Sequence, residues 1–200
     1  MNQAKAPHSK PIFIQTFSIN SLQAQRLIKR VFRRTVNALY STEVILRVIG
    51  NEAEVDKIEQ IINQLINENA QALHNEKIRI DKLIEANGID ETPHYTNPVT
   101  FEAKISSPQV SQFVVLIKKL DNLMISIDSI WLSGVITSKQ RLDNNYAWQQ
   151  RVMKLARRII DIEIRARKSA KAKGKQAEVE NTAPEESGEE EMSEDEESFK

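Results

Sequence analysis

The clearest alternation of apolar and polar residues along the chain lies in segment 99–105, which follows Pro98 and predicts a short strand. Its apolar positions are Phe101, Ala103 and Ile105, and its polar positions are Thr100, Glu102 and Lys104. One face of the strand is therefore apolar, and the other is chemically varied. A lone strand of this length is not stable, so it needs a partner strand from another copy of the chain or from the same chain.

Segment 11–18 is the candidate partner within the same chain. It is dense in strand-forming residues, namely Ile12, Phe13, Ile14, Thr16 and Phe17. Both faces of this segment are partly apolar, so the pattern does not decide which face points outward. The sequence leaves open whether the ribbon forms within one chain or between two chains.

Helical patterns follow the first strand. Asn20 or Ser21 can cap a helix with an apolar stripe, and Ser41 or Thr42 can cap a shorter helix that ends before Gly50. Segment 52–86 predicts one long helix. Its apolar spacing lapses at Asn69, which favours an arm of a helical bundle over a long coiled coil.

The second strand leads directly into another pair of helices. Ser107 can cap the first of them, with Pro108 at its first position, and Asp121-Asn122 can turn the chain into a second helix that reaches about residue 136. Ser138 can cap the last helix. The predicted fold is mainly α with a short two-stranded β-ribbon, a ribbon-helix-helix-like core elaborated by long helices.

A weak internal similarity accompanies this order of elements. In both halves of the chain a proline precedes a strand, a polar cap, and a helix ending in a basic pair, Lys29-Arg30 in the first half and Lys118-Lys119 in the second. Chance and true duplication both account for such a parallel.

The charges divide the chain into three parts, although lysines and arginines equal aspartates and glutamates in number. Residues 1–10 are polar and predicted to be flexible, residues 11–172 form one domain, and residues 173–200 form an acidic tail that is predicted to be disordered. Without this tail the body is distinctly basic, and we expect the tail to shield the basic surface from non-specific DNA binding.

Basic residues gather at the start of the chain, before any acidic residue occurs. Such surfaces attract phosphate backbones, because neutralised phosphates release their condensed counterions. The alternative is a set of ordinary solvated helix faces. The candidate phosphate-binding residues are Lys10, Arg26, Lys29, Arg30, Arg33 and Arg34.

Other classes of function find little support. The chain has no cysteine, no uninterrupted apolar span and no apolar signal sequence, so we expect a cytoplasmic protein with no membrane contact. Its three histidines have no metal-ligand spacing, and no catalytic motif occurs. We therefore expect no enzyme activity, metal, cofactor or small-molecule substrate.

The polar face of the second strand suits DNA recognition. A two-stranded ribbon fits the major groove, where outward side chains contact base edges. Lys104 can donate to guanine, Glu102 can accept from cytosine, and Thr100 can touch a thymine methyl group. The alternative is an ordinary strand face exposed to water.

Several segments resemble the AcaB-like family of conjugative plasmids and integrative conjugative elements. They are the motif at 22–28, the long middle helix, the strand ending at 101–108 and the pair Leu120-Asp121. The resemblance covers roughly residues 11–164, and it implies a ribbon-helix-helix-type transcriptional regulator that activates transfer genes.

The combined prediction is a sequence-specific regulator, expected to be an activator of conjugative transfer genes, that binds double-stranded promoter or operator DNA as a homodimer. The basic residues would hold phosphates and position the ribbon without specifying sequence. The alternative is a non-enzymatic scaffolding component of a DNA-transfer apparatus, with the long helix as its docking arm. Which of the two strands faces the DNA stays open.

Overall fold

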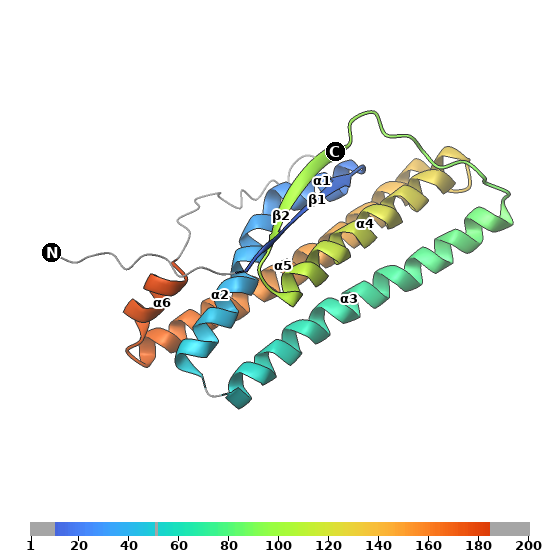
Figure 1. Cartoon of the computed structure of the whole chain (residues 1–200). Coiled ribbons are helices and arrows are strands. Elements are labelled where there is room, and N and C mark those ends of the chain that lie inside the picture. Colours follow the sequence, from blue (N-terminus) through green and yellow to red (C-terminus); the bar gives the residue numbers. More distant parts are fainter. Residues whose placement is uncertain (1–10, 51, 185–200) are drawn as a thin grey trace.

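The chain folds into a helical bundle with a two-stranded ribbon along one side (Figure 1). The computed structural model describes residues 11–50 and 52–184. Its elements are β1 (Phe13–Ile19), α1 (Leu22–Leu27), the π-helical segment η1 (Ile28–Phe32), α2 (Arg33–Ile49), α3 (Glu52–Ala86), β2 (Val99–Ile105), α4 (Pro108–Leu132), α5 (Ser138–Ala172) and α6 (Gln176–Thr182).

The ribbon forms within one chain. β1 pairs with β2 in antiparallel register, from Phe13 opposite Ile105 to Ile19 opposite Val99, with Thr16 opposite Glu102 at the centre. The partner of the second strand is therefore the N-terminal strand, and the ribbon needs no second copy of the chain. A homodimer stays a prediction.

Two strand-helix-helix units make up the fold, and a constant shift of 86 residues relates them. The shift connects the capping residues Ser21 and Ser107, and it connects the first residues of α3 and α5. It also connects Gly88 with Gly174, which both adopt positive φ just after a long helix. The order of elements seen in the sequence thus corresponds to a repeated architecture, although the two basic pairs are not equivalent, because the shift relates Lys29-Arg30 to Val115-Leu116.

The strand register obeys the same symmetry. Thr16 and Glu102 are equivalent under the shift, and they are also directly opposite each other. A pseudo-twofold axis therefore passes through the centre of the ribbon and exchanges the two units. A ribbon built from two identical chains has this arrangement with an exact axis.

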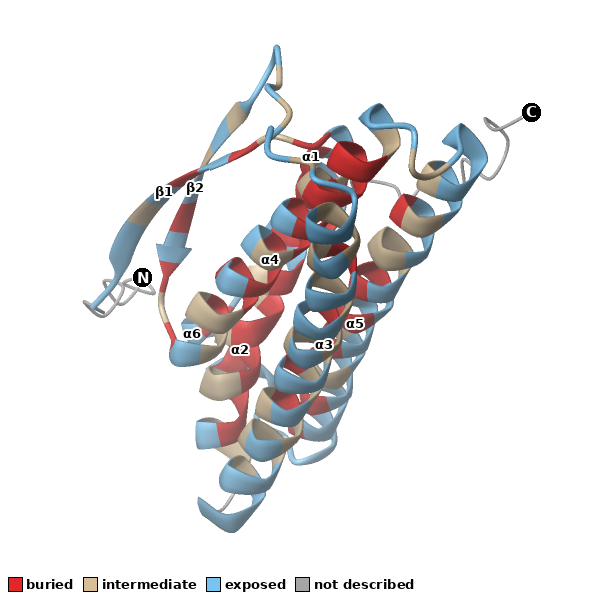
Figure 2. Cartoon of the chain, turned by 90° about the vertical axis from the view of Figure 1, so that its right-hand side faces the viewer, coloured by how far each residue is buried: buried red, intermediate tan, exposed pale blue. Residues whose placement is uncertain are grey.

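The helices of the two units pack in a crossed manner. α3 packs mainly on α4 of the other unit, and α5 packs mainly on α2. Buried residues lie on the inward helix faces, while the outward faces carry exposed residues (Figure 2). Ile66 and Leu73 of α3 and their equivalents Val152 and Ile159 of α5 all belong to one core. Neither unit buries its apolar surface without the other, so the two form one domain.

The structure corrects two predicted helix boundaries. The first helix continues from Leu22 to Ile49 through η1, with no new start at Ser41 or Thr42. Both residues are buried, and Thr42 Oγ1 donates to the Ala38 carbonyl one turn earlier in place of capping a new helix.

Asp121-Asn122 is not a turn either, because α4 runs through it. The Asp121 side chain is buried and accepts four hydrogen bonds from the junction between β1 and α1. These tertiary contacts outweigh the modest helix cost of an aspartate, which is about 0.7 kcal/mol at most.

The helix caps follow the sequence closely. Ser107 caps α4 with Pro108 at the first helical position, as predicted. Thr137, rather than Ser138, caps α5, because its hydroxyl and the Gln140 side chain form a reciprocal capping box.

Part of the predicted disordered tail is helical. α6 forms because Val179 packs against Ile45, Ala166 and Ala170 in a small second core. A truncation that tests the shielding role of the acidic tail should therefore start at residue 185. Residues 185–200, as well as 1–10 with the candidate Lys10, lie outside the described residues.

None of the helices that the structure describes is long and apolar enough to cross a membrane.

We expect Asp121→Ala to lower the free energy of unfolding by about 2–3 kcal/mol, because it leaves the buried donors of Ser21 and Asn20 without an acceptor. Urea unfolding followed by circular dichroism measures this loss. The matched control, Asp143→Ala, removes an exposed aspartate of α5 and should change stability by less than about 0.5 kcal/mol. Equal effects of the two substitutions would contradict the anchoring role.

Candidate nucleic-acid interface

The outer face of the ribbon carries alternate residues of both strands. All of them are exposed, and they are Ile14, Thr16 and Ser18 of β1 and Thr100, Glu102 and Lys104 of β2. The three predicted base-reading residues of β2 thus lie together on this face. Both strands contribute three residues to it, so the face does not single out one of the two strands.

Three cross-strand pairs order this face. Ile14 lies opposite Lys104, Thr16 opposite Glu102 and Ser18 opposite Thr100. Together they offer an apolar group, a cation, a carboxylate and three hydroxyls. These groups match the features that base edges present in the major groove, namely methyl groups, acceptors and donors.

Ile14, Thr16 and Ser18 are the residues of this face that sequence reasoning missed. The apolar pattern of β1 did not decide which face points outward, because apolar residues occur on both faces. The apolar Ile14 lies on the outer face, where it is 62% exposed. The spacing of each strand to the serine that caps the next helix would have identified these residues. Thr100, Glu102 and Lys104 lie seven, five and three residues before Ser107, and the new residues lie at the same distances before Ser21.

The inner face holds the ribbon on the bundle through aromatic contacts. The Phe17 ring of β1 lies 6.1 Å from the Phe101 ring of β2 and 6.1 Å from the Phe32 ring of η1. Phe32 in turn stacks on Phe113 of α4 at 6.0 Å. This row of rings connects β1 and β2 to η1 and α4. Each pair of adjacent rings contributes about 0.5–1.5 kcal/mol beyond its buried area.

Polar contacts fix one end of the ribbon. Asp121 of α4 accepts from the Ser21 backbone N–H at 2.8 Å and from the Ser21 hydroxyl at 2.6 Å. The Gln25 side chain donates to the Ile19 carbonyl at 3.1 Å and to the Asn97 carbonyl at 3.0 Å. Gln25 therefore connects the end of β1 with the segment that enters β2.

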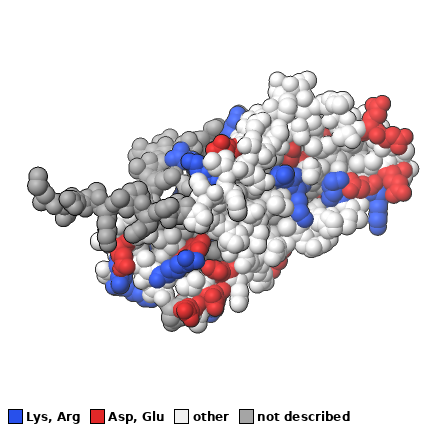
Figure 3. Space-filling model, viewed as in Figure 1, with Lys and Arg blue, Asp and Glu red and all other residues white. Residues whose placement is uncertain are grey.

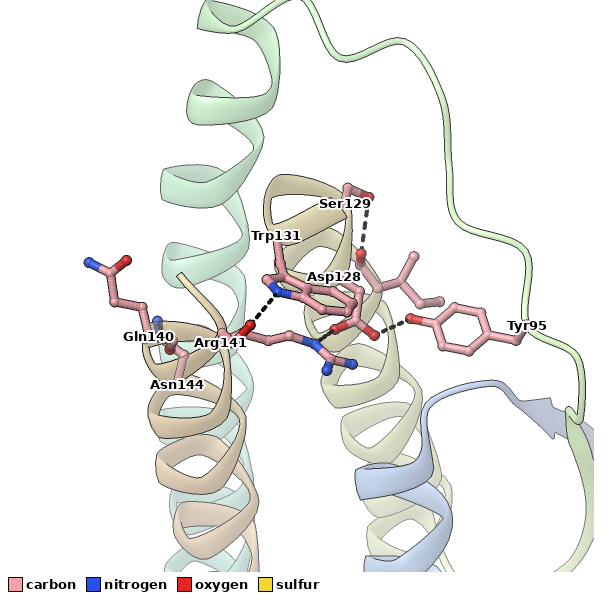
Figure 4. Close-up of polar contacts among 9 residues, drawn as sticks. Tyr95, Asp128, Ser129, Trp131, Gln140, Arg141 and Asn144 are labelled. Atoms are coloured by element: carbon pink, nitrogen blue, oxygen red, sulfur yellow. Dashed lines mark hydrogen bonds and ion pairs between the residues drawn. The ribbon is translucent and has the colours of Figure 1, made fainter. Parts of the chain in front are cut away.

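A second cluster fixes the segment before β2 (Figure 4). The buried Asp128 of α4 accepts from the Tyr95 hydroxyl at 2.7 Å and from Arg141 Nε at 2.6 Å. The Arg141 guanidinium also lies 4.0 Å from the centre of the Trp131 ring. Burial, and then the hydrogen bond to Asp128, raise the pKa of Tyr95 above its ordinary value.

Apart from Lys10, which lies outside the described residues, the predicted phosphate-binding residues lie on the helix that follows β1. Arg26, Lys29, Arg30 and Arg33 are exposed on α1, η1 and the start of α2. Arg34 forms an ion pair with the buried Glu163 of α5 at 2.7 Å, so it links two helices of the bundle. Glu163 also accepts from Arg167, which completes the neutralisation of this buried carboxylate.

Basic and acidic side chains are interspersed on the face shown in Figure 3. This face therefore presents no continuous basic surface. Any phosphate binding would depend on local groups of cations, such as the group on α1 and η1, rather than on a uniform field.

The described fold and site define a mainly helical protein whose intramolecular two-stranded ribbon is carried by a ribbon-helix-helix-like core. No protein-family model matches the chain, and no curated protein sequence does either. The crystal structure of selenomethionine-containing AcaB from uropathogenic E. coli is similar, with a TM-score of 0.85 and 51% sequence identity. The similarity covers 88% of this chain and 92% of the AcaB chain. The chain belongs to the AcaB family.

We expect Tyr95→Phe to cost about 1 kcal/mol near neutral pH, because it removes a hydrogen bond to Asp128. The raised pKa adds a pH dependence. The unfolded chain ionises this tyrosine near pH 10 while the folded chain keeps its proton, so the contribution is fully present below about pH 10 and is lost as pH rises further.

Unfolding free energies between about pH 9 and pH 11 test this prediction. The natural chain should lose stability more steeply above about pH 10 than Tyr95→Phe does. Tyr146→Phe, which alters a tyrosine that is 59% exposed, serves as the control and should keep the steep loss. Parallel curves for the natural chain and Tyr95→Phe would contradict the prediction.

Proposed function

We propose that the chain is a sequence-specific DNA-binding regulator, an activator of conjugative transfer genes, that inserts its ribbon into the major groove. The observation that carries the proposal is the outer face of the ribbon. Its six exposed side chains project together from the two paired strands. A two-stranded ribbon has the width that the major groove accepts.

The anchoring of the ribbon supports the same proposal. The aromatic row under the strands and the contacts of Asp121 and Gln25 fix its position on the bundle. Base reading needs side chains held in register, because each hydrogen bond to a base edge tolerates little displacement. Exposed cations on α1 and η1 can contact the flanking phosphates and position the ribbon.

The resemblance to the AcaB-like family implies the biological role as a regulator of transfer genes. The scaffolding alternative gains less support. It requires a docking face on the long helix α3, and the apolar residues Ile62, Ile66, Leu73 and Ile80 of this helix are already used in the core with α4 as the main neighbour, which leaves its mostly polar outer face.

The natural chain is first used to select the duplexes it binds from a library of randomised sequence. Gel shifts then measure the binding of each variant to the selected duplex and to unselected duplexes. Lys104→Ala should weaken binding to the selected duplex by about 1–3 kcal/mol, and Thr100→Ala should weaken it by less, while binding to unselected duplexes changes little. Arg30→Ala should weaken both alike and reduce the salt slope by about 0.9, because it removes one phosphate contact.

Arg79→Ala is the matched control for Arg30→Ala, since it removes an arginine of α3 that pairs with Glu76. We expect it to change neither affinity nor salt slope. Failure to enrich any sequence, or equal losses on all duplexes for Lys104→Ala and Arg30→Ala, would overturn the proposed function.

A further inference from the structure

The backbone of the ribbon is symmetric, but the side chains on its outer face are not. The pseudo-twofold axis makes Ile14 equivalent to Thr100, and it makes Ser18 equivalent to Lys104. An apolar residue thus corresponds to a hydroxyl, and another hydroxyl corresponds to a cation. In a ribbon of two identical chains these equivalent positions would carry identical residues.

The two ends of the outer face consequently differ in chemistry. At one end Ile14 lies beside Lys104, and at the other end Ser18 lies beside Thr100. At the first end Ile14 can contact a thymine methyl group and Lys104 can donate to guanine acceptors, so this end can distinguish between bases. The second end offers two hydroxyls, which can donate to or accept from several bases and therefore discriminate weakly.

The helices that follow the two ends of the ribbon differ in the charges they expose in their first turns. α1 follows the Ser18–Thr100 end and exposes Arg26 and Lys29. The equivalent positions of α4, which follows the Ile14–Lys104 end, are Gln112 and Val115. Two exposed cations therefore accompany the weakly discriminating end, and uncharged residues take their places at the selective end, where Lys118 and Lys119 lie one to two turns further along α4.

We infer that one chain, in place of the homodimer expected from the sequence, is the complete reading unit and that it recognises a non-palindromic duplex site. The inference rests on the proposed function. A symmetric frame can align its axis with the local dyad of B-DNA, so both ends reach base edges at once. The Ile14–Lys104 end then specifies one half of the site, and the Ser18–Thr100 end contributes mainly phosphate contacts in the other half.

Selection of the full chain on randomised duplexes tests this inference first. The expected consensus is non-palindromic, with most sequence preference in one half. Native mass spectrometry of the complex should show one chain per selected duplex. A palindromic consensus bound by two chains would overturn the inference while leaving the proposed function intact. Enrichment of no sequence would instead remove the proposed function.

Variants at the two ends locate each half-site. The affinities of the natural chain, Lys104→Ala and Ser18→Ala are measured on duplexes that differ from the selected one by single base changes. Lys104 and Ser18 are both exposed, so replacing either with alanine should not disturb folding. Lys104→Ala should erase base preference in the selective half alone, with a loss of roughly 5- to 150-fold on the best sequence. Ser18→Ala should affect the other half alone, with a smaller loss.

A duplex that repeats the selective half-site as an inverted pair completes the design. The duplex with two selective halves should bind one natural chain no more tightly than the selected site, since only one end of the ribbon matches that half. Tighter binding of one chain to this duplex, or loss of preference in both halves from Lys104→Ala, would contradict the inference.

Discussion

The antiparallel pairing of β1 with β2 is the constraint on which the rest of the structure depends. Residues 13–19 and 99–105 are far apart in the sequence, yet they must lie side by side in a fixed register. The chain meets this requirement by placing a long helical hairpin between them. The entropic cost of closing such a loop grows only slowly with its length, so a long connection is acceptable if its helices gain a core.

The long helices provide that core through their crossed arrangement. α3 leaves the first unit and packs on α4 of the second, while α5 returns to pack on α2. Each helix therefore stabilises the unit to which it does not belong. The aromatic row of Phe17, Phe32 and Phe113 transmits this packing to the ribbon. The outer face of the strands stays exposed, while Phe17, Ile19, Ala103 and Ile105 on the other face are buried against the bundle.

The local elements of the fold were predictable because their signals are local. Alternation defined β2, the serine and proline at 107–108 defined the start of α4, and the apolar spacing defined α3. The choice of partner strand depended on tertiary contacts, and apolar Ile14 on the outer face obscured the orientation of β1. The predicted turn at Asp121 failed for a similar reason, because its hydrogen bonds come from residues about a hundred positions away. Half of the site was predicted, since the residues of β1 could not be placed from the apolar pattern of that strand and needed its spacing to Ser21 to be compared with the spacing of β2 to Ser107.

The central claim is that a single chain builds the ribbon, and a designed disulfide tests it most directly. The natural chain has no cysteine, and Thr16 and Glu102 lie directly opposite each other. Opposite Cα atoms in an antiparallel pair are about 4.5–5.5 Å apart, which is within the range of a disulfide. Oxidation of the double variant Thr16→Cys, Glu102→Cys should give a cross-linked product with the mass of one chain on a non-reducing denaturing gel. A cross-linked product with the mass of two chains would show that the strands pair between chains and would contradict the account.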